Sequence, residues 1–265
     1  MRIEVKNGCF TYPKSTQQVL TDISFKLGDA EIMTILGKNG IGKTTLLKCM
    51  SGMFKWDSGT TFINDKEFTS VKDIKTVAFV PQAHAQTLTY PYSVIDMVTM
   101  GRVRYMGALS IPSKQDVEFA WDALRTVGME EYADRACTQL SGGQLQMVFI
   151  ARALTAQPEM LIMDEPESHL DIKNQYRVIE LVEQLRAEQG ISSIINTHYP
   201  EHALRISDRV LMLGRGFYTF GGKEIITPEN MRRYFDVNAD VRFIEENQKK
   251  YESFVIFGTT DDEII

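Results

Sequence analysis

The sequence predicts an α/β fold with a parallel-sheet core, an N-terminal antiparallel β subdomain and an inserted α-helical subdomain. Short, mainly apolar runs recur along the chain and alternate with segments of helical periodicity. They lie at 31–37, 76–80, 160–164, 192–196 and 209–213. Such runs are typical of strands buried on both faces of a parallel sheet covered by helices. With 265 residues, 43% of them hydrophobic, the chain is long enough for a large core.

The elements themselves follow from local patterns. Near the N-terminus apolar residues alternate with polar ones, which predicts half-buried strands through Ile3, Val5, Ile23, Phe25 and Leu27. Ser113 and Asp116 have the spacing of an N-terminal cap, and Gly128 is expected to end the helix that they begin. A second helix is expected over residues 172–189, with Gly190 as its stop.

The rhythm of strands and helices suggests the domain organisation. The stretch from about 83 to 139 is loop-rich and then helical, so we expect a helical subdomain at about 83–157 inserted into one domain spanning 1–240. Residues 241–265 are expected to form a C-terminal extension whose role the sequence does not specify. It contains one strand-like piece, YESFVIF, and ends on the acidic phrase TTDDEII.

Composition excludes several classes of function. A formal charge of −6 argues against non-specific binding of nucleic acid, which needs a basic face. Apolar runs fall short of the roughly 20 residues that span a bilayer, and the charged start MRIEVKNG is unlike a signal peptide. The three cysteines, Cys9, Cys49 and Cys137, lack metal-binding or disulfide spacing, which indicates a reduced, cytoplasmic compartment. The four histidines show no metal-ligand spacing.

The stretch GKNGIGKTT at 37–45 predicts a phosphate-binding loop. Gly37, Gly42, Lys43 and Thr44 satisfy the pattern GxxxxGK[ST] between an apolar run and a helical segment, which is the context that the motif requires. Glycines let successive backbone N–H groups point at phosphate oxygens, and the helix N-terminus adds a partial positive charge. Lys43 is then expected to reach the β- and γ-phosphates, and the Thr44 hydroxyl to bind Mg²⁺.

Polar residues end three of the predicted strands. MLIMDEP at 160–166 delivers Asp164, expected to hold magnesium through water, and Glu165, expected to polarise an attacking water. His198 ends the run IINTH and can contact a γ-phosphate. Gln82 follows TVAFV and can reach the metal and the water.

A second glycine pair opens a helix in LSGGQ at 140–144. Ser141 can cap a helix that runs on through Val148 and Leu154. Read locally, the pair is a tight turn before a capped helix, but a glycine pair in this place is also a good anion cradle.

Taken in order, the motifs resemble those of the ATP-binding subunit of ATP-binding-cassette (ABC) transporters, over about residues 2–240. They are GKNGIGKTT, VPQ, LSGGQ, MLIMDEP, SHLD and NTH. The resemblance implies a P-loop NTPase (ABC ATPase) fold with ATP and Mg²⁺ as cofactors. It implies that Tyr12 stacks on adenine and that the phosphates are held by Gly37, Lys38, Asn39, Gly40, Ile41, Gly42, Lys43, Thr44 and Thr45. Catalysis would involve Glu165 as the base with His198, Lys43 and Gln82, and Mg²⁺ would be held by Thr44, Gln82 and Asp164.

The same resemblance implies partners. Two copies would close head to tail over two ATP molecules, each bound in trans by Ser141, Gly142, Gly143 and Gln144 of the other copy. Asp171 would lie in the loop that crosses between protomers. The helical subdomain would dock on integral membrane permease subunits at the cytoplasmic side of the membrane, where the chain would be peripheral. A solute-binding protein would be an indirect partner.

Two further stretches, YPYSVIDMVTMGR at 90–102 and ITPEN at 226–230, resemble the importers of iron–siderophore complexes, haem and cobalamin. Molybdate or tungstate uptake subunits of the same branch would match as well, so the expected function is import of a metal chelate or a related metal oxyanion. The sequence departs from the common pattern at Lys38, Ile41 and Glu167, and in the Tyr199–Pro200 pair after His198, which removes no expected catalytic group.

Other readings stay open. The main alternative is a soluble ABC ATPase that moves no solute, such as a scaffold in iron–sulfur assembly. Translation-type members usually carry two cassettes and chromosome-maintenance members long coiled coils, and this chain has one cassette and no heptad stretch. A nucleotide-sensing regulator without activity is disfavoured by the presence of both Glu165 and His198.

Overall fold

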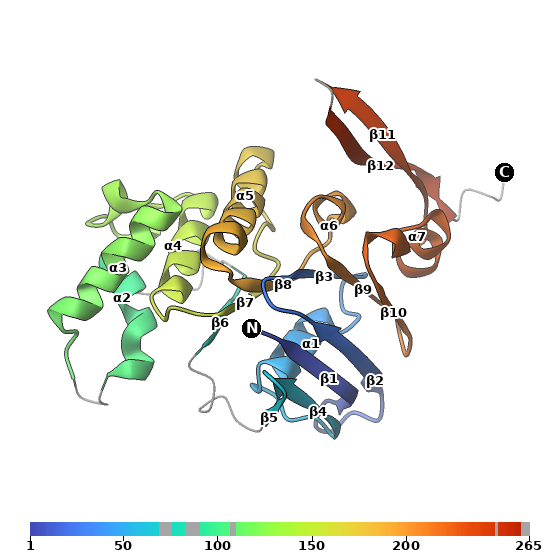
Figure 1. Ribbon diagram of the computed structural model, residues 1–265, viewed down its shortest axis with the longest axis horizontal. Coiled ribbons are helices and arrows are strands. Elements are labelled where there is room, and N and C mark those ends of the chain that lie inside the picture. The colour runs from blue at the N-terminus through green and yellow to red at the C-terminus, as the bar shows by residue number, and fades with distance from the viewer. Residues whose placement is uncertain (69–75, 83–90, 107–109, 247–248, 261–265) are drawn as a thin grey trace. The chain divides into compact units, whose positions relative to one another are not determined.

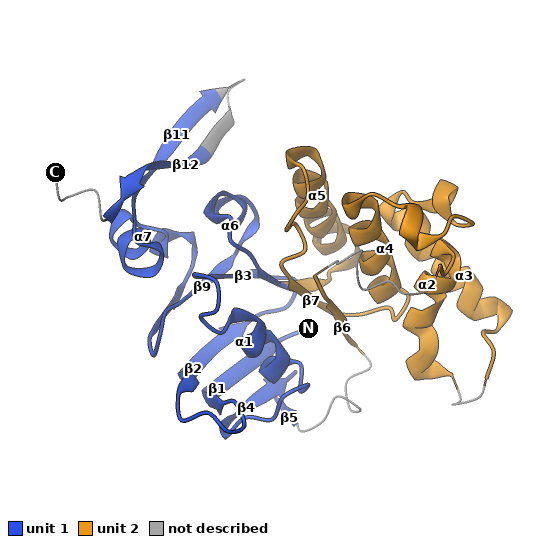
Figure 2. Cartoon of the chain, turned by 180° about the vertical axis from the view of Figure 1, so that it is seen from behind, with its two compact units in different colours: residues 1–71, 194–265 blue, residues 72–193 orange. Residues whose placement is uncertain are grey.

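The computed structural model describes residues 1–68, 76–82, 91–106, 110–246 and 249–260 (Figure 1). The chain divides into two compact units, drawn in blue and orange in Figure 2. Unit 1 contains residues 1–71 and 194–265, and unit 2 contains residues 72–193. The first unit therefore combines both ends of the chain, while the second is a single continuous stretch.

Unit 1 begins with an antiparallel sheet of strand order β2-β1-β4-β5. Its strands are β1 (Ile3–Thr11), β2 (Gln18–Leu27), β4 (Ser58–Ile63) and β5 (Lys66–Phe68). Burial alternates along β2, where Ile23, Phe25 and Leu27 are buried and the residues between them are not. The predicted half-buried strands are confirmed, because one face of the sheet packs on the core and the other meets solvent.

A six-stranded sheet has the order β10-β9-β3-β8-β7-β6, and the boundary between the units falls within β8. Its strands are β3 (Ile32–Leu36), β6 (Val77–Val80), β7 (Met160–Asp164), β8 (Ser192–Asn196), β9 (Arg209–Leu213) and β10 (Tyr218–Gly221). β3 pairs in parallel with β9, and β6 with β7, whereas β10 is antiparallel to β9. All five residues of β3 and of β8 are buried, so the apolar runs are the core strands that the sequence predicts.

Unit 2 supplies most of the helices. They are α2 (Val94–Thr99), η3 (Met100–Tyr105), α3 (Lys114–Val127), η4 (Glu130–Tyr132), η5 (Cys137–Gln139), α4 (Gly142–Leu154) and α5 (Ile172–Gln189). α3 opens on a reciprocal capping box of Ser113 and Asp116 and ends at Gly128, which is left-handed with φ 66°, as predicted. The capping hydrogen bonds from Ser113 hold the pKa of Asp116 below its usual value. The predicted start of the helical insertion, 83–90, lies outside the described residues.

Unit 1 also contains helices and a hairpin near its C-terminal end. Its helices are α1 (Lys43–Met50), α6 (Pro200–Ile206), η6 (Lys223–Ile225) and α7 (Pro228–Phe235). The antiparallel hairpin of β11 (Val237–Glu246) and β12 (Lys249–Thr259) follows directly. The strand-like piece YESFVIF lies within β12, but its partner β11 was not expected and begins before residue 241.

The structure also shows the state of the cysteines and the character of the helices. All three cysteines are free thiols, and Cys49 and Cys137 are buried. Burial raises the pKa of the Cys49 thiol to about 12, so this group is an inert part of the core. No helix in the described part of the chain is both long and apolar enough to cross a membrane.

Candidate active site

The phosphate loop of unit 1 needs its glycines for two reasons. Three of them have positive φ, namely 155° at Gly37, 74° at Gly40 and 116° at Gly42, which L side chains rarely adopt. In addition, a Cβ on Gly37 would lie 2.5 Å from the carbonyl oxygen of Leu213, on the neighbouring strand β9. The path of the loop out of β3 therefore favours glycine at these positions, most strongly at Gly37, where a side chain would also meet the backbone of β9.

The helix that follows the loop starts in an unusual way. Gly42 is the N-cap of α1 in a left-handed conformation, and no side chain caps the helix. Caps are commonly supplied by Ser, Thr, Asp or Asn, whose oxygens satisfy N–H groups of the first turn. A helix start whose N-cap residue is glycine and supplies no side-chain cap, after a glycine-rich bend, suits the oxygens of a bound phosphate.

Lys43 lies at the centre of this loop and is almost completely buried. Its Nζ donates to the carbonyl oxygen of Gly37 at 2.6 Å and to that of Lys38 at 3.0 Å, and it is 3.3 Å from Nδ1 of His198. Because an ammonium group can only donate, Nδ1 of His198 must accept, and Nε2 then carries the ring hydrogen. The structure thus brings together Lys43 and His198, two of the residues predicted to act on the γ-phosphate.

Tyr12 follows β1 and is attached to the same helix. Its hydroxyl is 2.7 Å from Oγ1 of Thr45 in α1, and its ring makes edge-on contacts with Phe10 and Phe54. The side chain is nevertheless 41% exposed. A partly exposed ring fixed through its hydroxyl and by two aromatic contacts is compatible with the predicted stacking on adenine.

In unit 2, the predicted acids lie at the end of β7. Asp164 is the last residue of the strand, and Glu165 has left-handed backbone geometry with φ 48°. The Glu165 carboxylate oxygen Oε2 accepts from Nε2 of Gln82 at 3.3 Å and from Oγ of Ser168 at 3.0 Å. A non-glycine residue in this region is costly, and such backbone strain is often found at functional sites. Gln82 and the predicted base Glu165 therefore touch, and they are joined by Ser168, the first residue of SHLD, to which the sequence assigned no role.

LSGGQ opens α4 with a reciprocal capping box. Oγ of Ser141 accepts from the backbone N–H of Gln144 at 3.3 Å, and the Gln144 side chain accepts from the N–H of Ser141 at 3.0 Å. The predicted cap is confirmed. Gly143 is buried, and a Cβ there would lie 2.6 Å from Cγ of Asn174. This glycine therefore permits a close approach of α4 to another element.

That element is the start of α5, where Asp171 is the N-cap. Asp171 accepts from the backbone N–H of Asn174 at 2.8 Å and from its side-chain amide at 3.0 Å. Asn174 thus links Gly143 of LSGGQ (140–144), called the signature motif below, to Asp171, the aspartate predicted to cross between protomers. The sequence offered one signal for this contact, the Asp-x-x-Asn spacing of a helix cap.

The residues predicted to bind magnesium offer the type of ligand atom that this ion prefers. Thr44 in unit 1, and Asp164 and Gln82 in unit 2, offer hydroxyl, carboxylate and amide oxygens, which this hard cation prefers. Among the described residues no group of three or more His, Cys, Asp or Glu side chains is gathered to hold a metal. Mg²⁺ commonly takes only one or two protein ligands and completes its shell with water and substrate phosphates, so a sparse donor set is compatible with it.

Known proteins match both the sequence and the fold. Residues 20–168 match the family described as ABC transporter. An ABC transporter ATP-binding protein of Methanocaldococcus jannaschii is 38% identical over 84% of this chain and 88% of its own, and the manganese transport system ATP-binding protein of Bacillus subtilis is 36% identical over 88% and 92%. Among solved structures, a metal-chelate type ABC transporter in an inward-facing conformation is 29% identical over 96% of both chains, with a TM-score of 0.87. The chain therefore belongs to the ABC transporter family, as one of its ATP-binding, ATP-hydrolysing subunits.

Proposed function

We propose that this ATPase powers the import of a metal chelate, such as iron–siderophore, haem or cobalamin, or of a related metal oxyanion, through a separate membrane permease. The observation that carries the proposal is the likeness to a metal-chelate type transporter over nearly the whole chain. The manganese transport relative supports the same class of cargo. The chain would then lie on the cytoplasmic side of the membrane, attached through the permease.

The chemistry of ATP hydrolysis assigns roles to the residues of each unit. Bound ATP would supply the γ-phosphoryl group. Thr44, Asp164 and Gln82 would hold Mg²⁺, which would neutralise phosphate charge. Glu165 orients and deprotonates the attacking water. Lys43 donates to the phosphate oxygens, and Nε2–H of His198 provides a further donor where negative charge develops.

The signature motif supports a head-to-tail pair of chains. Cassettes of the family form dimers, and we propose that Ser141, Gly142, Gly143 and Gln144 hold the ATP bound to the partner. Asp171 would enter the same interface. Hydrolysis then removes the phosphate that bridges the two copies, so the closed dimer loses affinity and opens. The conformational change of the dimer would be transmitted to the permease.

Replacing Glu165 with Gln tests the proposed base. We expect unchanged ATP affinity, turnover lower by at least about 100-fold, and an ATP-dependent dimer that persists in light scattering. Glu188→Gln, on the outer face of α5, is a matched control that should behave like the parent. Normal hydrolysis by Glu165→Gln would show that another group activates the water.

Uptake assays test the cargo. A strain that lacks the gene should lose uptake of one member of a panel of iron chelates, cobalamin, molybdate and Mn²⁺, and should regain it with the parent gene but not with the Glu165→Gln variant. Unaltered uptake of the whole panel, together with recovery of the protein away from membranes, would favour the soluble-scaffold alternative.

A further inference from the structure

Lys38 of the phosphate loop is engaged in two directions. Its carbonyl oxygen accepts from the ammonium group of Lys43 at 3.0 Å. Its side chain forms an ion pair with Asp236, the C-cap residue of α7. One residue therefore connects the buried lysine of the loop to the C-terminal part of the chain.

Asp236 is held in place by its own backbone. It is the C-cap of α7 in a left-handed conformation, with φ 57°. Its N–H donates to the carbonyl oxygen of Arg232 at 3.0 Å, and its carbonyl oxygen accepts from the N–H of Thr260 at 3.0 Å. The carboxylate thus sits where α7 and both ends of the β11–β12 hairpin meet, so it is a fixed partner for Lys38.

The same C-terminal segment also packs beneath the loop. Leu36, the last residue of β3 and the one before Gly37, lies in a buried apolar cluster. The cluster includes Met231 and Tyr234 of α7 and Ala239 of β11, and the partly buried Phe254 of β12 packs against it. The strand that delivers the phosphate loop is therefore supported from the C-terminal segment by apolar contact.

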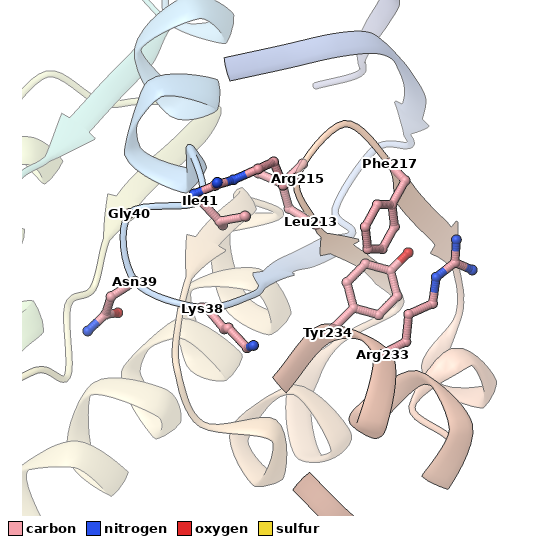
Figure 3. A pocket seen from close by; sticks show the side chains of 10 residues that line it. Lys38, Asn39, Gly40, Ile41, Leu213, Arg215, Phe217, Arg233 and Tyr234 are labelled. Atoms are coloured by element: carbon pink, nitrogen blue, oxygen red, sulfur yellow. The ribbon is translucent and has the colours of Figure 1, made fainter. Parts of the chain in front are cut away.

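A cavity lies beside the phosphate loop near Lys38. The cavity of about 300 Å³ is lined by residues 38–41 of the loop, by the β9–β10 turn, and by Arg233 and Tyr234 of α7 (Figure 3). Lys38 lines this space, so its charged contact with Asp236 ties the loop to α7 at the edge of the cavity.

We propose that α7 and the β11–β12 hairpin position the phosphate loop for ATP, through the ion pair of Lys38 and Asp236. Both are positioning residues: Asp236 acts through Lys38, and Lys38 through the carbonyl group that contacts Lys43. This inference rests on the proposed role of the phosphate loop in ATP binding, and it gives the C-terminal segment a function in that site.

The expected effect is modest because the pair is solvated. The side chains of Lys38 and Asp236 are 44% and 57% exposed, and exposed ion pairs contribute little because water and salt screen them. Loss of the pair should therefore weaken ATP binding by about three- to fivefold, the upper value corresponding to about 1 kcal/mol.

The test is a double-mutant cycle of Lys38→Met and Asp236→Asn, with Kd, KM and kcat for ATP and Tm measured for each variant. We expect each single variant to raise Kd and KM by about three- to fivefold with kcat unchanged, since a contact that only prepares the site affects binding. The double variant should be no worse than either single one. Asp240→Asn is the matched control, because it breaks an exposed pair with Arg242 in β11 and should leave Kd unchanged.

Several outcomes would overturn the proposal. A double variant whose effect is the product of the two single effects would mean that the residues act independently. A lower Tm with unchanged Kd would mean that the pair only stabilises the fold. If Lys38→Met does not fold, Asp236→Asn decides alone, because it keeps both shape and backbone preference. A parent that binds no ATP would instead contradict the role of the phosphate loop itself.

Discussion

Two helices of this chain start from glycines, and they do so by different physical means. α1 of unit 1 begins at left-handed Gly42, without a side-chain cap. α4 of unit 2 begins at Ser141, with a reciprocal capping box to Gln144. In the phosphate loop the backbone conformation itself demands glycine, whereas Gly143 is required by the close approach of Asn174.

The difference shows what each helix start is built to do. The phosphate loop combines bare backbone with the buried Lys43, so its backbone and one cation together form a cradle. The signature motif is organised by side chains: Ser141 and Gln144 satisfy each other, and Asn174 connects Gly143 to Asp171. We infer that the first cradle binds phosphate by itself, and that the second presents a shaped surface to a partner.

The largest effect is expected from removing the cation of the first cradle. Lys43→Ala should raise Kd for ATP by about 100-fold, because charge-assisted hydrogen bonds to phosphate are each worth about 1.5–3 kcal/mol. Titration with ATP by calorimetry measures the change. Lys55→Ala, which removes an exposed lysine after α1, controls for the loss of one positive charge. Unchanged affinity of Lys43→Ala would contradict the phosphate-loop assignment.

A substitution in the signature motif should affect turnover rather than ATP affinity. Ser141→Arg is expected to leave ATP binding by the single chain intact but to lower turnover by at least about 100-fold, because a bulky cation would block closure over the partner's nucleotide. The matched control is Ser113→Arg, which removes the equivalent capping box at the start of α3. Both variants lose a cap worth about 1 kcal/mol of stability. Full turnover by Ser141→Arg would show that the signature motif is only a helix start.

Most helices and strands could be predicted because apolar runs and helix caps depend only on residues close together in the sequence. Apolar runs gave the core strands, and the caps at Ser113 and Ser141 lie where their spacing indicates. β11 was missed because its sequence, VNADVRFIEE, mixes charged and apolar residues and draws its regularity from pairing with β12.

The motifs indicated which residues belong to the site, but not the contacts that hold them. Ser168 is joined to Glu165 through a left-handed turn, and Asn174 meets Gly143 only when α4 and α5 pack together. Asp236 meets Lys38 across most of the chain's length. Such contacts depend on tertiary structure, so one sequence taken alone carries little signal for them.

Substitution of the glycines themselves separates their two uses most clearly. Gly143→Ala should destabilise the chain by about 1–3 kcal/mol through overpacking, since its Cβ would meet the side chain of Asn174. Gly142→Ala is the matched control, because a Cβ there would be at an ordinary 3.8 Å from Leu170. Free energies of unfolding from urea titration measure both.

A second substitution tests which atoms the added Cβ meets, because a side chain can be removed but a backbone oxygen cannot. Asn174→Ala removes the atoms that Gly143→Ala would strike, so the double variant should be no less stable than Asn174→Ala alone. In the phosphate loop, Gly37→Ala strikes the backbone oxygen of Leu213 and also strains φ 155°, so truncating the Leu213 side chain should give no relief. Relief in the phosphate loop, or none in the signature motif, would mean that the two glycines do not serve these different purposes.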